Sequence, residues 1–591
     1  MNRTHYCGNV NADHVGKEVE LCGWVARVRD LGNLTFIQLR DKTGIVQIAL
    51  NTEVSDKKIV EITKKLKSEY VINVKGKVIK RTNENINKDM KTGEIEVVAE
   101  EINILNESKL PPFHIDDNVT VSENLRLKYR YLDLRRPFMN NILTFRYNVI
   151  KSIREFLAYE NFTEVETPFL IKSTPEGARD FVVPSRLHSG KFYALPQSPQ
   201  LFKQLLMVSG VDKYFQIARC FRDEDARSDR QTDFTQLDME MSFSDENMIF
   251  STMEKLLYKV FKENIGIELS LPFDRMKYDE AMEKYGSDKP ERRAGMELET
   301  LTEIFKNTSF KVFAQAIEKS GVIKAVVLKN KADQISRKTV DIYEQLVKKN
   351  GAAGLAWTKY INNEFEGGVS KFISDKKEEL VGKLKIENND IVFFGAGEKD
   401  IVNNYLGILR LHLIREWNLL NKEEKKFDML WVTDFPLFEK NDNGGYDAKH
   451  HLFSMPTDDT LQYVDSAPEK VYGRLYDLVC NGNELASGSI RIHNPQLQRK
   501  VMRVVGLTDE EMDRKFGFLL EAFEYGAPPH GGIAPGIDRL IMVMKGLDNL
   551  KDVIAFPKTN TQLCLLTDAP DYLSEEQLVE LGLKVVSTDK E

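Results

Sequence analysis

The sequence predicts an α+β protein of several domains, in which a small β-barrel precedes a larger domain built on an antiparallel sheet. Its 591 residues exceed the length that one hydrophobic core usually serves. Short segments of alternating apolar and polar residues fill the first hundred residues, and the same alternation returns at residues 236–243. A Lys-rich stretch of different texture, residues 290–425, predicts an inserted α/β domain.

Composition and charge narrow the class of protein. The net charge of −8 gives no overall attraction to nucleic acid, so any RNA binding must use local basic or aromatic surfaces. There is no run of 18 apolar residues and no apolar core of a secretory signal near the N-terminus, so we expect no membrane span. Five scattered cysteines without a C-x-x-C pair indicate a reducing compartment and argue against a structural zinc site. We therefore expect a cytoplasmic protein.

The first domain is predicted to be a five-stranded barrel. A helical pattern at residues 57–67 lies between the third and fourth of its strands. Five strands with a helix after the third are the outline of an OB fold, although any small five-stranded barrel would give the same pattern. The predicted strands cover residues 19–29, 35–40, 45–50, 71–80 and 94–99.

The larger domain is predicted to begin with a helix over residues 141–159, because apolar side chains recur there at helical spacing. A strand should follow and end at Pro168, which cannot donate to a ladder. The predicted boundaries are 1–105 for the barrel, 106–140 for a hinge, 141–289 and 426–560 for the two parts of the larger domain, 290–425 for the insertion and 561–591 for a C-terminal extension.

The densest group of polar residues lies on a predicted hairpin at residues 213–243. Its second strand has one apolar and one polar face, and the polar face carries Asp238. Arg222 and Glu224 near the end of the first strand complete the group. A functional site explains this face better than solvated surface does, but an exposed antiparallel sheet would show the same alternation.

A second hairpin is predicted at Asn481-Gly482, a strong signal for a type I′ turn. This turn would place Asp477 on the same face as Glu484, one diagonal step away. Two such carboxylates could share Mg²⁺, or they could be two solvated acids on a surface hairpin. Simple alternation puts Arg491 on the opposite face, so a common site needs a bulge, which Gly488 would permit.

A third motif, YGAPPHGGIAPGIDRL at residues 525–540, places Arg539 at a Gly-rich junction before an apolar helix. Glycines allow close backbone approach to a ligand, and the arginine is a candidate phosphate or adenine contact. A Gly-rich turn before a helix is also common without any ligand.

These motifs together resemble a known family. FRDED at residues 221–225 and GIDRL at 536–540 resemble motifs 2 and 3 of class II aminoacyl-tRNA synthetases, and the helix and strand ending at Pro168 resemble motif 1. The stretches TPEGARDFVVPSR and ALPQSPQLFKQLLM resemble bacterial aspartyl-tRNA synthetases in particular. The resemblance runs over nearly the whole chain, including the barrel and the insertion.

The resemblance implies a class II antiparallel-sheet catalytic domain, an OB-fold anticodon-binding domain and a homodimer. It also implies ATP-dependent attachment of L-aspartate to tRNA through aspartyl-adenylate, with release of pyrophosphate. Such catalysis rests on alignment and charge stabilisation, and the sequence offers no Ser-His-Asp or Cys-His arrangement.

The resemblance also implies roles for individual residues, with Arg222, Glu224 and Arg539 as the catalytic group. Mg²⁺ would bind Asp477 and Glu484. The implied ATP contacts are Arg222, Asp223, Glu224, Gln231, Phe234, Glu484, Gly536, Ile537, Asp538 and Arg539. The implied aspartate contacts are Glu176, Ser198, Gln200, Lys203, Arg222, Asp238, His450 and Arg491. The implied anticodon contacts are Arg29, Phe36, Gln47 and Glu94.

Several alternatives remain open at this point. Phe36 could be a barrel core residue, and the pair His450-His451 could be ordinary surface. Lys203 and Arg491 favour aspartate over the amide of asparagine because they are cations that match a carboxylate. Asparaginyl- and lysyl-tRNA synthetases share the motifs, and a catalytically silent RNA-binding relative would lack the ATP-binding residues. A non-discriminating enzyme that also aspartylates asparagine tRNA is a further alternative. In the family this choice involves the loop after the first barrel strand, where Leu31 weakly favours strict specificity.

Overall fold

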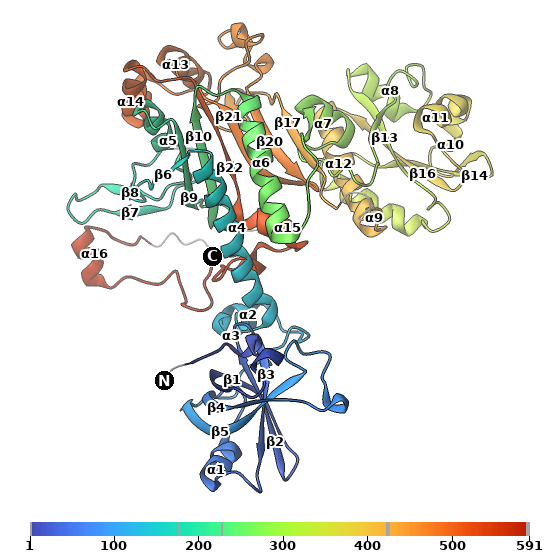
Figure 1. Ribbon diagram of the computed structural model, residues 1–591. Helices are drawn as coiled ribbons and strands as arrows, with labels where there is room; N and C mark the ends of the chain where they lie inside the picture. Colours follow the sequence, from blue (N-terminus) through green and yellow to red (C-terminus); the bar gives the residue numbers. More distant parts are fainter. Residues whose placement is uncertain (1–2, 175–176, 226–228, 421–425, 442, 587–591) are drawn as a thin grey trace. The chain divides into compact units, whose positions relative to one another are not determined.

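The computed structural model describes all residues except 1–2, 175–176, 226–228, 421–425, 442 and 587–591 (Figure 1). The chain divides into two compact units. The first contains residues 1–148, 225–231 and 549–572, and the second contains residues 149–224, 232–548 and 573–591. In the part of the chain that is described, no helix is both long enough and apolar enough to cross a membrane.

The first unit begins with a closed barrel in the strand order β1-β2-β3-β5-β4, as the OB-fold prediction required. Each strand lies within a few residues of its predicted position, except that β5 continues to Asn106. The elements are β1 (Glu18–Asp30), β2 (Leu34–Asp41), β3 (Gly44–Asn51), α1 (Lys57–Lys65), β4 (Val71–Lys80) and β5 (Ile95–Asn106).

Alternation along the barrel strands separates an apolar core from an outer face. Ile37, Leu39 and Ile48 are fully buried in the core. Phe36 lies between core positions on β2 and points to the other side of the strand, where it is partly exposed. Phe36 is therefore not a residue of the barrel core.

Three helices follow the barrel: α2 (Glu123–Lys128), α3 (Arg130–Asp133) and α4 (Pro137–Tyr159). Helix α4 begins four residues before its predicted start, because Pro137 at the first helical position needs no hydrogen-bond partner for its nitrogen. In the first unit, buried Arg130 pairs with Asp133 at 2.6 Å and donates to the carbonyl of Lys551 at 2.6 Å. The segment from residue 549 is thereby fastened to the helices after the barrel.

The second unit contains an eight-stranded sheet in the order β11-β17-β20-β21-β22-β10-β9-β6. Its ladders are antiparallel except for the two outermost pairs, β11–β17 and β6–β9. Its strands are β6 (Thr163–Glu164), β9 (Lys213–Phe221), β10 (Asp233–Ser242), β11 (Asp274–Lys277), β17 (Met429–Thr433), β20 (Leu475–Cys480), β21 (Asn483–Ile490) and β22 (His530–Pro535).

The strand predicted to end at Pro168 is shorter than expected. β6 is an edge strand, and its ladder with β9 contains only the pairs Thr163–Tyr214 and Glu164–Phe215. The prediction of its end was therefore wrong by several residues, because the pattern of apolar residues cannot show where the neighbouring strand stops pairing.

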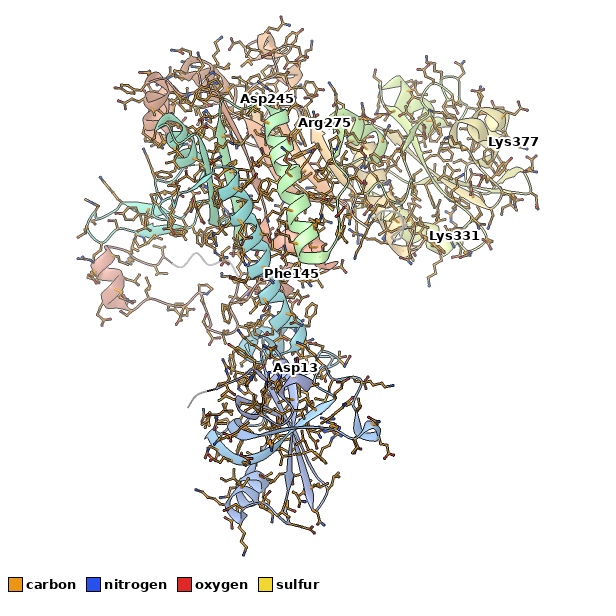
Figure 2. The ribbon with its side chains drawn as sticks, in the orientation of Figure 1. Asp13, Phe145, Asp245, Arg275, Lys331 and Lys377 are labelled. Carbon is orange, nitrogen blue, oxygen red and sulfur yellow. The ribbon has the colours of Figure 1, made fainter. Side chains whose placement is uncertain are left out.

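Helix α6 (Glu246–Ile265) covers the apolar face of this sheet, which Figure 1 shows with α6 lying along the strands. Its Phe250 stacks on Trp431 of β17 with ring centres 4.2 Å apart. Asp245, labelled in Figure 2, caps the helix by accepting from the backbone nitrogen of Met248 at 2.8 Å. The polar residues of the central strands therefore face away from α6.

The remaining elements of the second unit include helix α14 (Asp509–Glu524), which begins with a capping box of Thr508 and Glu511. Further helices of this unit are α5 (Gln200–Val208), α7 (Tyr278–Tyr285), α13 (Pro495–Val504), α15 (Ile537–Lys545) and α16 (Glu575–Leu581). Two small hairpins pair β7 (Val182–Pro184) with β8 (Phe192–Ala194) and β18 (Phe438–Lys440) with β19 (Tyr446–Ala448).

The insertion forms a five-stranded antiparallel sheet in the order β12-β13-β16-β14-β15, with helices on both faces. Alternating residues of β16 belong to two hydrophobic cores. Ile391 and Phe393 pack with α9 and α12, whereas Val392 and Phe394 pack with α8 and α11. This is the predicted α/β domain, and Figure 2 marks it with Lys331 and Lys377. Its strands are β12 (Glu299–Thr300), β13 (Val322–Leu328), β14 (Ala356–Ile361), β15 (Glu364–Glu366) and β16 (Asp390–Gly397). Its helices are α8 (Lys311–Glu318), α9 (Arg337–Lys348), α10 (Ser370–Ile373), α11 (Lys377–Leu384) and α12 (Lys399–Glu416).

Candidate active site

The polar face of β10 is buried, so the alternative of an exposed antiparallel sheet is wrong. Asp238 and Glu240 have no exposed surface, although both carry a carboxylate. Buried carboxylates are costly unless cations and hydrogen bonds compensate them. The residues that compensate them come from two other elements and define the site.

Four side chains form a buried charge cluster: Lys203, Asp238, Glu240 and Arg491. Lys203 Nζ of α5 lies 2.7 Å from Asp238 Oδ1 and 3.2 Å from Glu240 Oε2. Arg491 Nε, just after β21, donates to Glu240 Oε1 at 2.9 Å. Each side chain is at most 2% exposed. Two cations and two anions therefore balance one another in a place that water does not reach.

The two carboxylates of the charge cluster respond differently to this environment. Burial alone would raise the pKa of Glu240, but Arg491 and Lys203 outweigh it and lower the pKa to about 2. Burial raises the pKa of Asp238, and Lys203 offsets only part of that effect. Asp238 Oδ2 is buried without a hydrogen-bond partner in the part of the chain described. Asp238 therefore has an acceptor available for a positively charged group.

Arg491 makes further contacts on the same face. Its Nη1 lies 2.7 Å from Ser489 Oγ and 2.7 Å from His451 Nε2. Because arginine only donates, His451 Nε2 must be the acceptor, and burial lowers the pKa of His451 well below its ordinary value. The structure thus places His451 against Arg491, whereas His450 packs on the ring of Phe435 with centres 4.7 Å apart. The aspartate contact predicted for His450 stays a prediction.

A bulge aligns the residues of β21, as expected, but not at Gly488. Val479 pairs with Glu484 as predicted, and the positive φ values of Asn481 and Gly482 fit the type I′ turn. The register shifts at the next step, where Leu485 is the additional residue. Glu484 and Arg491 therefore share one face.

Gly488 has another role, so the prediction that it permits the bulge was wrong. A Cβ at Gly488 would lie 2.3 Å from the carbonyl oxygen of Gly532 and 2.5 Å from the ring of Tyr476. Glycine at this position therefore allows β21 to pack closely against its neighbours.

Asp477 and Glu484 form the predicted acid pair. Asp477 Oδ1 is buried without a hydrogen-bond partner in the described chain, and Glu484 Oε2 lies 3.2 Å from Lys289 Nζ. Burial and the neighbouring Glu484 raise the pKa of Asp477 well above its ordinary value, whereas Lys289 and Arg539 outweigh burial and lower the pKa of Glu484. A buried carboxylate with one unpartnered oxygen, beside a second carboxylate, fits a hard divalent cation such as Mg²⁺. Among the residues described, no group of three or more His, Cys, Asp or Glu side chains is arranged to hold a metal, so a Mg²⁺ here would rely on water and substrate oxygens for its other ligands.

Arg222 of the FRDED segment lies just beyond the end of β9 rather than on the strand. β9 ends at Phe221, and the backbone nitrogen of Arg222 donates to the carbonyl of Thr232 at 2.8 Å, which continues the hairpin. The Arg222 guanidinium lies over the ring of Phe234, 5.1 Å from its centre. Asp223 is bridged to Arg179, and Glu224 follows it, half-buried.

The third motif lies at the start of α15. Arg539 Nη1 donates to the carbonyl of Glu484 at 2.8 Å, which brings it beside the acid pair. Asp538 is buried and accepts from the backbone nitrogen of Thr235 at 2.9 Å, so it joins the helix to β10. Ile537 points into the core, and Gly536 bonds to Leu485. Of these four residues, only Arg539 has a side chain directed at the acid pair.

The other predicted site residues are less closely grouped. Gln200 bonds to Gln204 at 3.1 Å and to Ser198 through its backbone nitrogen at 3.3 Å. Glu176 lies outside the described residues. Gln231 belongs to the first unit, where its side-chain oxygen accepts from the backbone nitrogen of Lys558 at 2.9 Å.

The predicted anticodon contacts lie on the outer face of the barrel. Arg29 pairs with Phe36 across β1 and β2, and Gln47 on β3 donates to Glu96 at 2.9 Å. Glu94 is exposed just before β5. Gln38, two residues after Phe36 on β2, pairs directly with Gln47 and was not singled out from the sequence.

Sequence reasoning gave no role to two residues of the site. Glu240 could have been found, since it lies two positions after Asp238 on the same strand face. Lys289 could not, because it pairs with a residue 195 positions away and lies in no recognisable motif.

Comparison with known proteins finds relatives along the whole chain. Residues 122–560 match the family described as tRNA synthetases class II (D, K and N), and residues 19–105 match an OB-fold nucleic acid binding domain. A protein of Geobacillus sp. strain WCH70 named aspartate–tRNA(Asp/Asn) ligase is 52% identical over 592 residues, covering 100% of this chain and 99% of its own. A protein of Geobacillus kaustophilus named aspartate–tRNA ligase is 50% identical over 593 residues and covers all of both chains.

Solved structures show the same fold at lower identity. Asparaginyl-tRNA synthetase from Pyrococcus horikoshii has a TM-score of 0.60 at 20% identity, covering 95% of this chain and 100% of that one. Aspartyl-tRNA synthetase from Entamoeba histolytica has a TM-score of 0.57 at 20% identity, covering 94% and 91%. At such identity these structures speak for the fold alone.

Proposed function

Since the chain belongs to the class II tRNA synthetases of the D, K and N group, we propose that it attaches L-aspartate to tRNA at the expense of ATP. Its relatives at 50–52% identity are named as aspartate–tRNA ligases. The reaction proceeds in two steps. The α-carboxylate of aspartate attacks the α-phosphorus of ATP and displaces pyrophosphate, and the terminal adenosine of the tRNA then takes the aspartyl group from the adenylate.

The charge cluster is the observation that carries the substrate assignment. Arg491 and Lys203 provide two buried cations for the side-chain carboxylate of aspartate, and Asp238 Oδ2 provides an acceptor for its ammonium group. An amino acid with an amide in place of the carboxylate would present N–H groups to residues that only donate. Leaving such buried donors unmatched costs enough to reject the amide strongly.

The neighbouring residues suit the chemistry of adenylate formation. Arg222 is the cation for the carboxylate and the α-phosphate, where negative charge builds up, and Arg539 is the cation for the nucleotide next to Glu484. Asp477 and Glu484 would hold Mg²⁺, which would neutralise the triphosphate when bound. Binding and orientation by these side chains supply the rate enhancement, without a protein nucleophile.

Recognition of the tRNA is assigned to the outer face of the barrel. Phe36 offers a partly exposed ring for stacking on an anticodon base, with Arg29 opposite it on β1 and Gln47 on the neighbouring strand β3. Aromatic stacking with polar contacts to base edges is how OB folds bind unpaired bases. We further propose a homodimer that acts in the cytoplasm.

ATP–pyrophosphate exchange tests this proposal. Labelled pyrophosphate should enter ATP when aspartate is supplied, and asparagine or lysine should not replace it. Exchange that depends on lysine or asparagine instead of aspartate would refute the substrate assignment, and absence of exchange with every amino acid would favour a silent RNA-binding protein.

A second candidate is an enzyme that aspartylates both aspartate and asparagine tRNAs. Several relatives of about 50% identity are named as ligases for both tRNAs. Leu31, 69% exposed in the loop after β1, instead favours an enzyme that is strict for aspartate tRNA. Charging purified aspartate and asparagine tRNAs side by side decides between them, because only the second candidate yields aspartyl-tRNA with both.

A further inference from the structure

Lys289 lies at the junction between the first catalytic segment and the insertion, on a loop that follows α7. Its Nζ is 3.2 Å from Glu484 Oε2, and its side chain is 39% exposed. Neither residue is close to the other in the chain, and the motifs of the family resemblance do not include Lys289. A cation is thus supplied to the acid pair from outside the motifs.

The loop of Lys289 is held on one side by helix α12 of the insertion. A Cβ at Gly286 would lie 2.0 Å from the carbonyl oxygen of Asn403, and a Cβ at Gly407 would lie 2.6 Å from that of Gly286. Only glycine at both positions permits this approach of α7's end to α12, which lie beside each other in Figure 1.

Arg410 of α12 adds polar contacts to the same segment. It is buried, donates to the carbonyl of Glu291 at 2.5 Å and also bonds to the carbonyl of Met296. Its guanidinium lies over the ring of Tyr285, 4.9 Å from the centre. A buried arginine that binds backbone carbonyls on both sides of a turn fixes the path of that turn.

The hairpin that carries Glu484 holds the segment on the other side. A Cβ at Gly482 would lie 3.2 Å from the Cβ of Glu291, so the turn packs directly on this residue. Arg292 pairs with Asp428 at 2.6 Å, and the backbone nitrogen of Asp428 bonds to Asn481 Oδ1 at 2.9 Å. Lys289 is therefore placed between two anchored elements, close to the acid pair.

The charges around Lys289 indicate what it can bind. Glu484 Oε2 is the atom that pairs with Lys289 and is also an oxygen that a metal on the acid pair would use. A lysine ammonium is a compact charge on a flexible stem with three donors, and it exchanges one oxygen partner for another readily. The anion that accompanies a metal at this site is the triphosphate, whose oxygens would be the nearest alternative partners.

We propose that Lys289 is a triphosphate-binding residue, which leaves Glu484 for the β- and γ-phosphate oxygens when ATP and Mg²⁺ bind. Helix α12 of the insertion positions it through Gly407 and Arg410. This inference rests on the proposed function, and it gives the inserted domain a part in nucleotide binding.

Binding measurements on the full-length protein separate this role from a structural one. The variant Lys289→Met should bind ATP with Mg²⁺ about 10- to 100-fold more weakly by titration calorimetry, which is the loss expected for a contact to a charged group. It should bind a sulfamoyl analogue of aspartyl-adenylate as the parent does, because that analogue has no β- or γ-phosphate. Lys289→Arg should recover part of the ATP affinity.

Lys284→Met is the matched control, because Lys284 is a half-exposed lysine of α7 whose ion pair in the described chain is with Glu280 on the same helix. It should bind both ligands like the parent. Equal weakening of ATP and of the analogue in Lys289→Met would overturn the proposal, and so would unchanged ATP affinity. Failure of the parent to bind the analogue would instead count against the proposed function.

Discussion

The two ends of the polar sheet face differ in how far their ion pairs are exposed to water. At one end, all four members of the charge cluster are at most 2% exposed. At the other end, beside the acid pair, Lys289 and Glu484 are 39% and 31% exposed. Each end has one buried carboxylate oxygen without a partner in the described chain, on Asp238 and on Asp477. The same strands thus carry a closed ionic network and an open one.

This difference in exposure indicates which part of the site is fixed by folding. A buried network cannot lose one member without leaving another charge unpaired, so it keeps its geometry. An exposed pair is screened by water and held weakly, so its partners can change. We infer that the site for aspartate is preformed and that the nucleotide completes its own site.

Arg222→Ala should have the largest effect on rate and little effect on stability, because Arg222 stacks on Phe234 outside the charge cluster. We expect aspartate-dependent exchange to fall by about 10³-fold or more, as for loss of a group that stabilises transition-state charge. The temperature of unfolding and the binding of tRNA through the barrel should stay close to those of the parent. Equal exchange rates in variant and parent would refute the role of Arg222.

Glu240→Gln should lower stability as well as activity, because it leaves buried Arg491 without its anion and Lys203 with Asp238 alone. Removing one partner of a buried ion pair costs about 3 kcal/mol or more. Denaturant unfolding of the second unit measures this loss. A variant as stable as the parent would show that the cluster is not the closed network that its geometry indicates.

The stability lost in Glu240→Gln should depend on pH. The pKa of Glu240 lies at about 2 in the folded protein and near 4.5 in the unfolded chain, so its stabilising contribution is present above pH 4.5 and is lost as the pH falls toward 2. The stability gap between parent and Glu240→Gln should therefore shrink as the pH is lowered below about 4.5. A gap that is constant from pH 7 to pH 3.5 would contradict the assignment.

Asp477→Asn is the matched substitution at the open end. Burial and Glu484 raise the pKa of Asp477, so its charge costs stability near neutral pH, and an amide of the same shape should leave the protein as stable as the parent or slightly more so. Exchange should fall by about 100-fold, as expected when a metal ligand is lost. Melting in the presence of a chelator and exchange over a range of Mg²⁺ concentrations check the two parts. If Asp477→Asn lost as much stability as Glu240→Gln, the two ends of the site would not differ in how folding depends on their charges.

Gly407→Ala should have the smallest effect. The added Cβ would meet the carbonyl oxygen of Gly286 and shift the loop of Lys289. ATP affinity should fall by several-fold, about 1 kcal/mol, while the adenylate analogue binds unchanged. The control is Gly382→Ala, at a helix position where a Cβ meets nothing within 4 Å. Weaker binding of both ligands would mean that the substitution acts on the whole site.

The sequence predicted local features well. Alternation located the barrel strands and β10, and Asn481-Gly482 predicted both the turn and the pairing of Val479 with Glu484. These features depend on neighbouring residues only. The site residues came from the resemblance to a family and not from local patterns alone.

Features that depend on distant contacts were missed or misplaced. The bulge was expected at Gly488 because glycine permits it, but the register shift occurs at Leu485, and Gly488 serves close packing on Gly532 and Tyr476. The pairing of Lys289 with Glu484 depends on how the insertion packs, which no local pattern encodes.

Hydrogen–deuterium exchange of the backbone, measured with each substrate added separately, tests whether the aspartate site is preformed and the nucleotide site is not. Aspartate alone should leave β10 and α5 as protected as they are in the protein by itself, because the charge cluster is already closed. ATP with Mg²⁺ should increase protection in the loop at residues 286–290 and in the turn at residues 481–484. Strong new protection of β10 and α5 on adding aspartate, with no change in the loop on adding ATP, would show that the aspartate site is not preformed and that ATP does not complete its own site.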